Sequence, residues 1–131
     1  MPSSPTFWKI EYTNFFEKAL KECLKVNYKK DKKGKQLFLE KIDEIIATIK
    51  ENPSFGDLEP FPDIKVPLGF ELRKVYFHAP RLRGTSAEAR LVYLVVKEKR
   101  TLILVHIYTH KQYEDRPDLD LLEALIKEHS K

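Results

Sequence analysis

The chain has 131 residues, of which 42% are hydrophobic and 34% are charged, and its formal net charge is +4. That length suffices for one domain with one buried core, without disulfides or a structural metal. No apolar run approaches the roughly 20 residues that span a bilayer, and the N-terminus lacks the pattern of a signal peptide. We therefore expect a single cytoplasmic domain over residues 1–131, not associated with a membrane, with residues 1–6 as a loose leader.

The charges are unevenly distributed along the chain. Residues 21–41 contain eight Lys and Arg against three acidic residues, and residues 71–100 again contain eight against three. The intervening residues 42–70 contain two basic and six acidic residues. Clustered Lys and Arg attract polyanions, above all nucleic acids. For the lysines of residues 29–35, a solvated helix surface is the simpler interpretation.

The first half of the chain predicts a short strand and two helices. Residues 7–12 alternate apolar and polar side chains, which is typical of a strand. Asn14 and Glu17 have the spacing of a capping box before a helix that ends near Tyr28. That helix carries Cys23, the one cysteine, on its apolar face, which favours a core role and excludes an internal disulfide. After a polar break over residues 29–34, a second helix is expected from Lys35 to Glu51.

The second half predicts a strand meander and a terminal helix. Residues 53–68 are rich in proline and read as an extended connection. From Phe70 on, three runs of β-branched and aromatic residues separated by charged turns predict three strands. A short helix is expected from Leu119, with Asp118 as its N-cap. The fold class is therefore α+β: an antiparallel sheet of about four strands on an N-terminal helical hairpin, with a short C-terminal helix.

Several well-known kinds of active site are absent from the sequence. No glycines have the spacing of a phosphate-binding loop, and no Cys/His set has the spacing of a zinc site. His106 and His110 would lie roughly 13 Å apart on an extended strand. Ser86 lacks a nucleophile elbow. We accordingly expect no metal and no cofactor.

Basic and aromatic side chains at the rim of the meander are the remaining candidates. The set is Arg73, Lys74, Arg81, Arg83, Arg90, His110, Lys111 and Tyr113. These residue types suit RNA cleavage by the substrate's own 2′-hydroxyl, a reaction that needs a base, an acid and cations around the phosphate but no metal. The guanidinium fork of Arg matches phosphate oxygens. Histidine titrates near neutral pH, and tyrosine can stack on a splayed base.

Each candidate also has a structural interpretation. Arg73 and Arg90 could pair with Glu71 or Glu88 within the sheet, and Arg81 and Arg83 could simply solvate a loop. His106 lies inside an apolar strand and is expected to be a core histidine.

Four segments of the meander resemble the RelE/ParE superfamily of type II toxins. They are Glu71-Leu-Arg-Lys-Val, Arg90-Leu-Val-Tyr-Leu-Val, Leu102-Ile-Leu-Val-His-Ile-Tyr and His110-Lys-Gln-Tyr-Glu-Asp. The closing Tyr-x-x-Lys-x-x-Glu-Asp and the loop Pro80-Arg-Leu-Arg-Gly-Thr-Ser look like the HigB branch. The resemblance covers nearly the whole chain, and it implies a RelE-like fold.

The resemblance implies a ribosome-dependent mRNA endonuclease that an acidic cognate antitoxin holds inactive. It assigns phosphate binding to Arg73 and Arg90, to which we add Lys74, Arg81 and Arg83, and it assigns the catalytic positions to His110, Lys111 and Tyr113. Lys111 stands where relatives often have an arginine. Two alternatives remain: a ParE-like toxin that binds DNA gyrase and cuts nothing, and a non-catalytic interaction domain of the same fold. The sequence does not indicate an oligomeric state.

Overall fold

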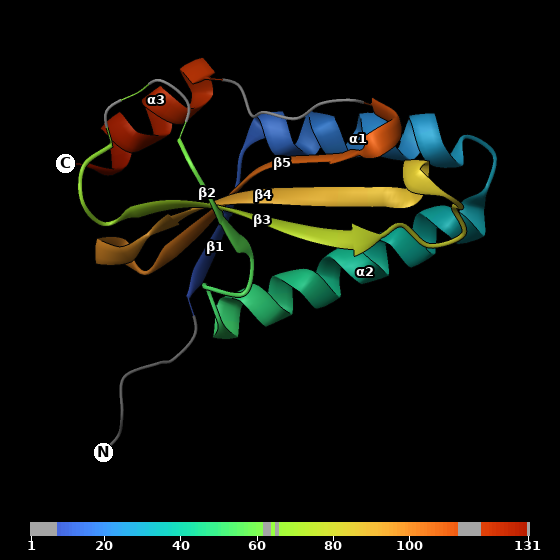
Figure 1. The fold of residues 1–131 in the computed structure, drawn as a ribbon, viewed down its shortest axis with the longest axis horizontal. Helices are drawn as coiled ribbons and strands as arrows, with labels where there is room; N and C mark the ends of the chain where they lie inside the picture. Colours follow the sequence, from blue (N-terminus) through green and yellow to red (C-terminus); the bar gives the residue numbers. More distant parts are fainter. Residues whose placement is uncertain (1–7, 62–63, 65, 113–118, 131) are drawn as a thin grey trace.

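A five-stranded sheet forms the centre of the protein (Figure 1) in the computed structural model, which describes residues 8–61, 64, 66–112 and 119–130. Its strands are β1 (Lys9–Tyr12), β2 (Asp57–Glu59), β3 (Phe70–His78), β4 (Glu88–Val96) and β5 (Thr101–Thr109). The order across the sheet is β1-β5-β4-β3-β2. The α+β class and the meander of β3, β4 and β5 are thus confirmed.

The sheet differs from the expected one in two respects. β1 pairs in parallel with β5, so the sheet is mixed rather than antiparallel. A fifth strand, β2, lies in the proline-rich segment and pairs antiparallel with β3 at the edge of the sheet. Pro53 and Pro60 flank β2 but do not interrupt it, so its three residues keep the N–H groups that a ladder needs.

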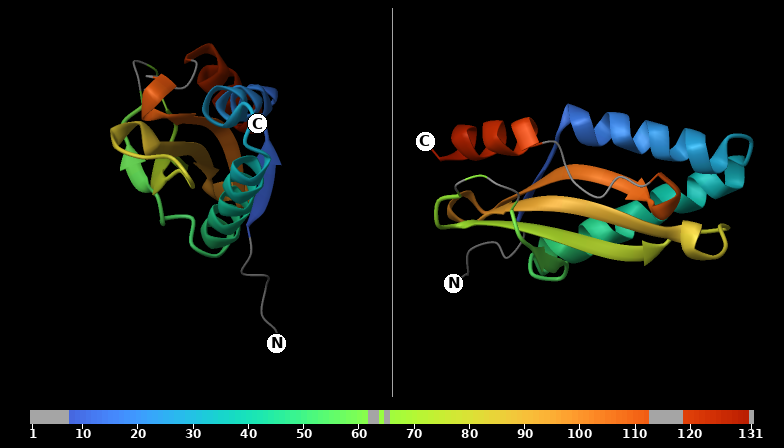
Figure 2. Two further views of the ribbon diagram at one scale, coloured as in Figure 1. Left: turned by 90° about the vertical axis from the view of Figure 1, so that its right-hand side faces the viewer. Right: turned by 45° about the horizontal axis from the view of Figure 1, so that its top comes forward.

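The described residues form three helices beside the sheet: α1 (Asn14–Tyr28), α2 (Lys32–Glu51) and α3 (Leu119–His129). Short 3-10 helices precede β4, connect β4 to β5 and follow β5; they are η1 (Thr85–Ala87), η2 (Lys97–Lys99) and η3 (His110–Gln112). Figure 2 shows α1 and α2 joined at one end of the molecule and diverging from there. No helix among the described residues is long and apolar enough to cross a membrane.

The start of α2 differs from the prediction. The Asp31 carboxylate accepts a hydrogen bond from the backbone N–H of Gly34 at 3.0 Å and caps the helix, which therefore begins at Lys32. Gly34 lies in the first turn instead of ending the loop. A Cβ at this position would come within 2.5 Å of both Asp31 and Tyr28, which explains a glycine inside a helix.

The two faces of the sheet are covered by different elements. One face packs against α1 and α2 through residues such as Phe16, Phe38, Ile49, Leu91 and Leu104, and the other packs against α3 through residues such as Leu72, Leu94, Ile103, Leu122 and Ile126. This explains why β4 and β5 are apolar on both faces. Cys23 is fully buried in the first core, as expected.

A bulge in β5 decides which side chains reach the second face. Val92 pairs with His106 but Tyr93 pairs with Leu104, so Val105 has no partner across the ladder. Because side chains alternate along a strand, one extra residue reverses the alternation beyond it. Tyr108 consequently belongs to the second core together with Ile103, although the two are an odd number of positions, five, apart in the sequence.

Candidate nucleic-acid interface

A band of cationic and aromatic side chains crosses three strands on the second face of the sheet. Tyr76 of β3 lies opposite Arg90 of β4, which lies opposite Tyr108 of β5. In the next row, Lys74 and His106 are both paired with Val92. We call Lys74, Tyr76, Arg90, His106 and Tyr108 the sheet band.

Arg90 occupies the centre of the sheet band. Its guanidinium carbon lies 5.5 Å from the centroid of the Tyr76 ring and 5.6 Å from that of Tyr108. The side chain is only 17% exposed, and one Nη donates to the Glu88 carboxylate. Its Nε is buried and has no hydrogen-bond partner within the part of the chain that the structure describes. A buried donor of this kind costs free energy unless a ligand satisfies it.

Lys74 supplies the second cation of the band. Its ammonium lies 3.2 Å from the Glu59 carboxylate of β2 and 5.8 Å from the centroid of the Tyr76 ring. Burial alone would lower the pKa of Lys74, but Tyr108 and Glu59 raise it above its ordinary value. Lys74 therefore stays charged and suits the binding of an anion rather than proton abstraction.

The two remaining members of the band are buried and neutral. Burial lowers the pKa of His106 to about 4, and the charge of Lys74 adds to this effect. Burial raises the pKa of Tyr108, against the opposing influence of Lys74 and Arg90. The His106 ring packs between Phe15 and Tyr108, at centroid distances of 5.0 and 4.8 Å. This agrees with the expectation that His106 is a core histidine.

Arg73 points to the opposite face from Lys74 because successive side chains of a strand alternate. Its Nη1 donates to the carbonyl oxygens of Gly56 at 2.6 Å and Ser54 at 3.3 Å, and its Nε donates to Glu71 at 2.9 Å. These contacts fasten the segment before β2 to β3. The structure therefore separates Arg73 from the sheet band and gives it the structural pairing with Glu71.

The loop after β3 carries Arg81 and Arg83. Arg81 has a left-handed backbone (φ 66°) and donates from Nε to Asp31 at 2.8 Å, thereby linking this loop to the start of α2. The ion pair with Arg81 and the hydrogen bond from Gly34 hold the pKa of Asp31 below its usual value. Arg83 is exposed. Neither arginine takes part in the aromatic contacts of the sheet band.

The expected catalytic residues follow the end of β5. His110 and Lys111 lie in η3, which packs near η1; His110 is half-buried and Lys111 is exposed. Gln112 secures this turn, since its side-chain oxygen accepts from the backbone N–H of Thr109 at 2.9 Å. Tyr113 lies outside the described residues, as does Asp118.

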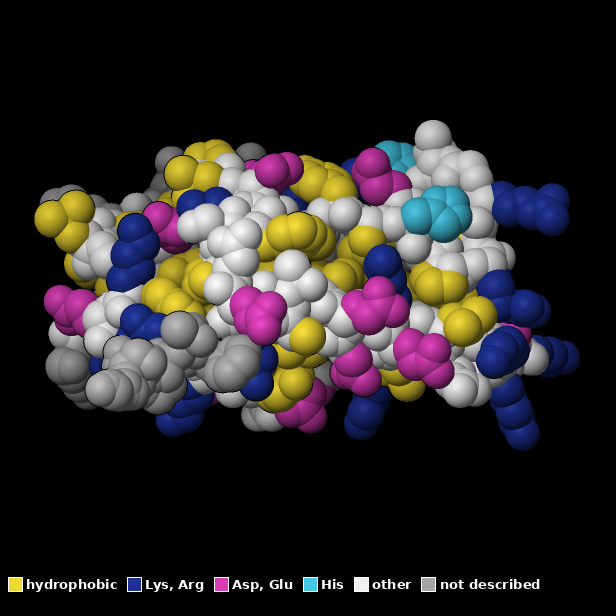
Figure 3. Space-filling view, turned by 90° about the horizontal axis from the view of Figure 1, so that it is seen from below, with side chains coloured by type: hydrophobic (Ala, Val, Ile, Leu, Met, Phe, Trp, Pro, Cys, Tyr) yellow, Lys and Arg dark blue, Asp and Glu magenta, His cyan; other side chains and the backbone are white. Residues whose placement is uncertain are grey.

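A basic end and an acidic middle characterise the outer surface near α2 (Figure 3). Lys29, Lys30, Lys32 and Lys33 are all exposed at the turn between α1 and α2. Acidic side chains gather over the middle of the molecule in this view. These lysines concentrate positive charge at the end of α2 that lies near the Arg81 loop.

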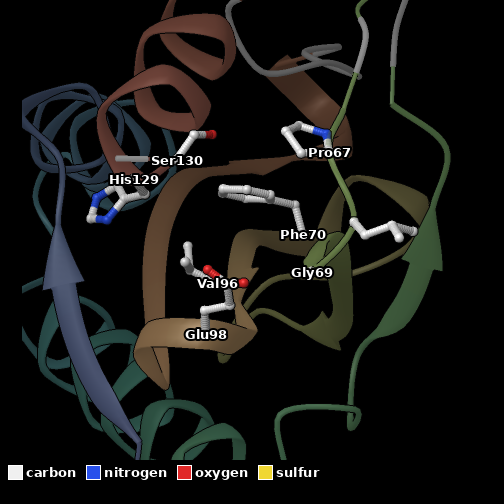
Figure 4. A pocket seen from close by; sticks show the side chains of 8 residues that line it. Pro67, Gly69, Phe70, Val96, Glu98, His129 and Ser130 are labelled. Carbon is white, nitrogen blue, oxygen red and sulfur yellow. The ribbon is translucent and has the colours of Figure 1, made fainter.

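A small pocket at the far ends of β3 and β4 differs from the sheet band in its chemistry (Figure 4). It has a volume of about 160 Å³, and its lining includes Gly69, Phe70, Glu98 and His129, but no Lys or Arg. The carboxylate of Glu98 would repel a phosphate. This pocket is therefore a poor candidate for nucleic-acid binding. Among the described residues, no group of three or more His, Cys, Asp or Glu could hold a metal ion.

Sequence reasoning missed two members of the sheet band, Tyr76 and Tyr108. Tyr76 could have been found by aligning β3 with β4 as neighbouring strands. The register that places Tyr76 opposite Arg90 brings an aromatic ring into contact with a guanidinium, which is a favourable cross-strand pair. Tyr108 carries no such signal, since its orientation depends on the bulge near Val105.

Taken together, these features define an α+β protein with a cationic and aromatic site on one face of its sheet. No family model matches the chain, and no curated protein matches it.

Several solved structures are similar, among them the following three. A mutant of the E. coli RelE toxin in the free state is 20% identical, with a TM-score of 0.48 over 81% of this chain and 86% of that one. The isolated E. coli RelE toxin is 21% identical, with a TM-score of 0.44 over 90% of this chain and 95% of that one. A conserved hypothetical protein from Helicobacter pylori is 26% identical, with a TM-score of 0.40 over 82% and 99%.

Proposed function

We propose that this chain is the toxin of a type II toxin–antitoxin pair, of the RelE kind, and that it cleaves mRNA on the ribosome. The observation that carries the proposal is Arg90, which lies near two tyrosine rings beside Lys74 and whose buried Nε has no hydrogen-bond partner among the described residues. A single-stranded RNA offers both ligands that this arrangement lacks: phosphate oxygens for the cations, and bases for an exposed ring. The motifs that resemble the RelE/ParE superfamily support the same function.

The proposed reaction is attack by a 2′-hydroxyl on the adjacent phosphorus. The hydroxyl loses its proton, the new O–P bond forms, and the bond to the 5′-oxygen breaks as that oxygen takes up a proton. The products are a 2′,3′-cyclic phosphate and a 5′-hydroxyl. Arg90 and Lys74 would neutralise the charge that builds on the phosphate oxygens. Tyr108 would act as a positioning residue, because its ring fixes one side of the Arg90 guanidinium.

Proton transfer is proposed for His110 rather than for His106. His106 is only 4% exposed and remains neutral down to a pH of about 4, so it is unsuited to exchange protons with a substrate. His110 lies at the rim, just beyond the end of β5. Lys111 would add a further cation, and Tyr113 stays a prediction for base stacking. Arg81 and Arg83 remain proposed as phosphate contacts of the loop, where binding would compete with Asp31 for Arg81.

The partner that inhibits such a toxin would be an acidic antitoxin segment, because it must cover a surface that carries Lys74 and Arg90. Carboxylates of that segment could satisfy the same donors as the phosphates.

The test is translation of a defined mRNA in a cell extract with the purified chain, with mapping of new RNA ends. We expect 5′-hydroxyl ends with the wild type, and far fewer with Arg90→Met. Arg73→Met is the matched control, because it removes an arginine of the same sheet that points to the opposite face. Intact mRNA under active translation by the wild type would refute the nuclease proposal.

A further inference from the structure

We propose that three polar side chains, those of Asn27, Thr109 and Gln112, act as positioning residues for the turn η3. This inference rests on the proposed function, which assigns proton transfer to His110 and a further cation to Lys111, both of which lie in η3. The three polar side chains do not contact the RNA in this proposal. They fix the backbone that carries the two catalytic side chains, and they connect that backbone to α1.

The turn η3 begins next to the sheet band, so its conformation decides where His110 faces. Tyr108 lies opposite Arg90, and Thr109 follows in the next row, opposite Ala89. His110 therefore comes only two residues after the ring that contacts Arg90. A misplacement of a reacting group by about 1 Å can lower a rate about a hundredfold. A small rotation of the turn would thus suffice to separate His110 from a phosphate bound by Arg90.

Gln112 closes the turn through the backbone of Thr109. Thr109 is fully buried (0% exposed), and a buried N–H group needs a hydrogen-bond partner. Its N–H donates to Oε1 of Gln112 at 2.9 Å, so the side chain three residues further on folds back over the turn. A residue without an acceptor at position 112 would leave this donor unsatisfied and would release the turn.

The hydroxyl of Thr109 links the turn to α1. Its Oγ1 lies 3.4 Å from Oδ1 of Asn27 and 3.4 Å from Oε1 of Gln112. Nδ2 of Asn27 donates to the carbonyl oxygen of Cys23 at 2.9 Å, which turns the amide oxygen of Asn27 toward Thr109. A hydroxyl has one hydrogen, so that of Thr109 donates to one of the two amide oxygens at a time. The side chain of Asn27 thereby ties the rigid helix to the end of β5.

The amide of Gln112 suits this role because it has no charge. A carboxylate at position 112 would accept the same hydrogen bonds from Thr109. It would also place a negative charge in the turn that carries Lys111, next to a site for phosphate, and would weaken the binding of RNA. Positioning and binding therefore respond differently to the two substitutions Gln112→Leu and Gln112→Glu.

The test measures cleavage of a defined mRNA on purified ribosomes and separates kcat from KM. Gln112→Leu removes the acceptor, so we expect kcat to fall about tenfold or more with little change in KM. Gln112→Glu keeps the acceptor, so kcat should stay within about threefold of the wild-type value while KM rises. A wild-type kcat in Gln112→Leu would overturn the proposal, and so would an equal fall of kcat in both variants.

A second pair of variants and one control locate the effect. Thr109→Val removes the hydroxyl and with it the link to Asn27, so its kcat should fall, whereas Thr109→Ser keeps the hydroxyl and should retain more of the kcat. Gln36→Leu makes the same change as Gln112→Leu on the exposed surface of α2, where the amide donates to Glu40 at 3.0 Å, and should cleave as the wild type does. A fall of kcat in Gln36→Leu, or an unchanged kcat in Thr109→Val, would overturn the assignment.

Nuclear magnetic resonance of the free protein separates this proposal from the proposed function. In Gln112→Leu at constant pH, hydrogen exchange of the Thr109 amide should become about tenfold faster, and the ring signals of His110 should shift while those of His129 stay in place. If the wild type leaves mRNA intact, the nuclease proposal fails, and these shifts would still support the positioning of His110. If the wild type cuts mRNA but Gln112→Leu shows neither change, the positioning proposal fails and the nuclease proposal stands.

Discussion

Arg90 and Arg73 lie on opposite faces of the sheet, and their replacement by methionine should separate function from stability. Arg90→Met removes a guanidinium that lies over two tyrosine rings. The two cation–π contacts together stabilise the protein by about 1–2 kcal/mol. It also removes an ion pair with the half-exposed Glu88, worth about 0–1 kcal/mol.

An opposite gain nearly cancels this loss. The buried Nε of Arg90 has no hydrogen-bond partner among the described residues, and removing such a donor relieves about 1–3 kcal/mol. Methionine also keeps apolar contact with both rings. The free energy of unfolding of Arg90→Met should therefore stay within about 1 kcal/mol of the wild type. Binding of a short single-stranded RNA should fall about tenfold, because a charge-assisted contact with phosphate is lost.

Arg73→Met should have the reverse effects. It removes charged hydrogen bonds to Gly56, Ser54 and Glu71, so we expect a loss of about 2 kcal/mol or more in the free energy of unfolding. RNA binding should change little. Urea unfolding followed by far-UV circular dichroism measures the first quantity, and fluorescence anisotropy with an RNA oligomer measures the second. If Arg90→Met lost more than about 3 kcal/mol while Arg73→Met retained wild-type stability, the roles assigned to the two faces would be reversed and our reasoning refuted.

Two further substitutions test buried groups of the two cores. Tyr93→Phe should lower the free energy of unfolding, measured with urea, by about 1–3 kcal/mol. The Tyr93 hydroxyl donates to the carbonyl oxygen of Pro53 at 2.6 Å and accepts from the N–H of Gly56 at 3.0 Å, and both bonds would be lost. A loss below about 0.5 kcal/mol would contradict these bonds. His106→Asn should flatten the pH dependence of stability between pH 6.5 and about 4. Burial and the charge of Lys74 lower the pKa of His106 in the folded protein, so the unfolded chain binds a proton more readily. The free energy of unfolding of the wild type is therefore not reduced by this group above pH 6.5, and it decreases as the pH falls toward 4. Equal slopes for the two proteins over that range would show that His106 does not titrate in this way.

Patterns of single elements predicted most of the fold. Periodicity identified α1 and α3 and all three strands of the meander, because each buries a continuous apolar face. The parallel pairing of β1 could not be predicted in this way, since it depends on which sheet edge remains open after the helices have packed. The strand β2 was missed because three residues between prolines carry no detectable alternation.

The candidate site was predictable only in part, for a reason that Arg73 and Lys74 illustrate. Both are basic and adjacent, and the sequence gives no sign of which one faces the second core. Register decides it: Lys74 shares its face with Leu72, whereas Arg73 turns toward the segment before β2. Adjacent basic residues on a strand should therefore be assigned opposite roles until a buried neighbour two positions away identifies the face of each.

The bulge in β5 extends this argument to Tyr108. A strictly alternating strand would place Tyr108 with Leu102 and Leu104, beneath the helical hairpin and far from Arg90. The unpaired Val105 reverses the alternation, so that Tyr108 closes one side of the Arg90 guanidinium. A bulge costs ladder hydrogen bonds, and an apolar core alone does not require one here. Deletion of Val105 should restore regular pairing and leave Arg90 opposite Tyr108, because the pairs on both sides of the bulge are kept. A folded deletion variant should therefore bind RNA as the wild type does. Binding reduced to the level of Arg90→Met in a folded deletion variant would contradict this register and show that the bulge itself shapes the site.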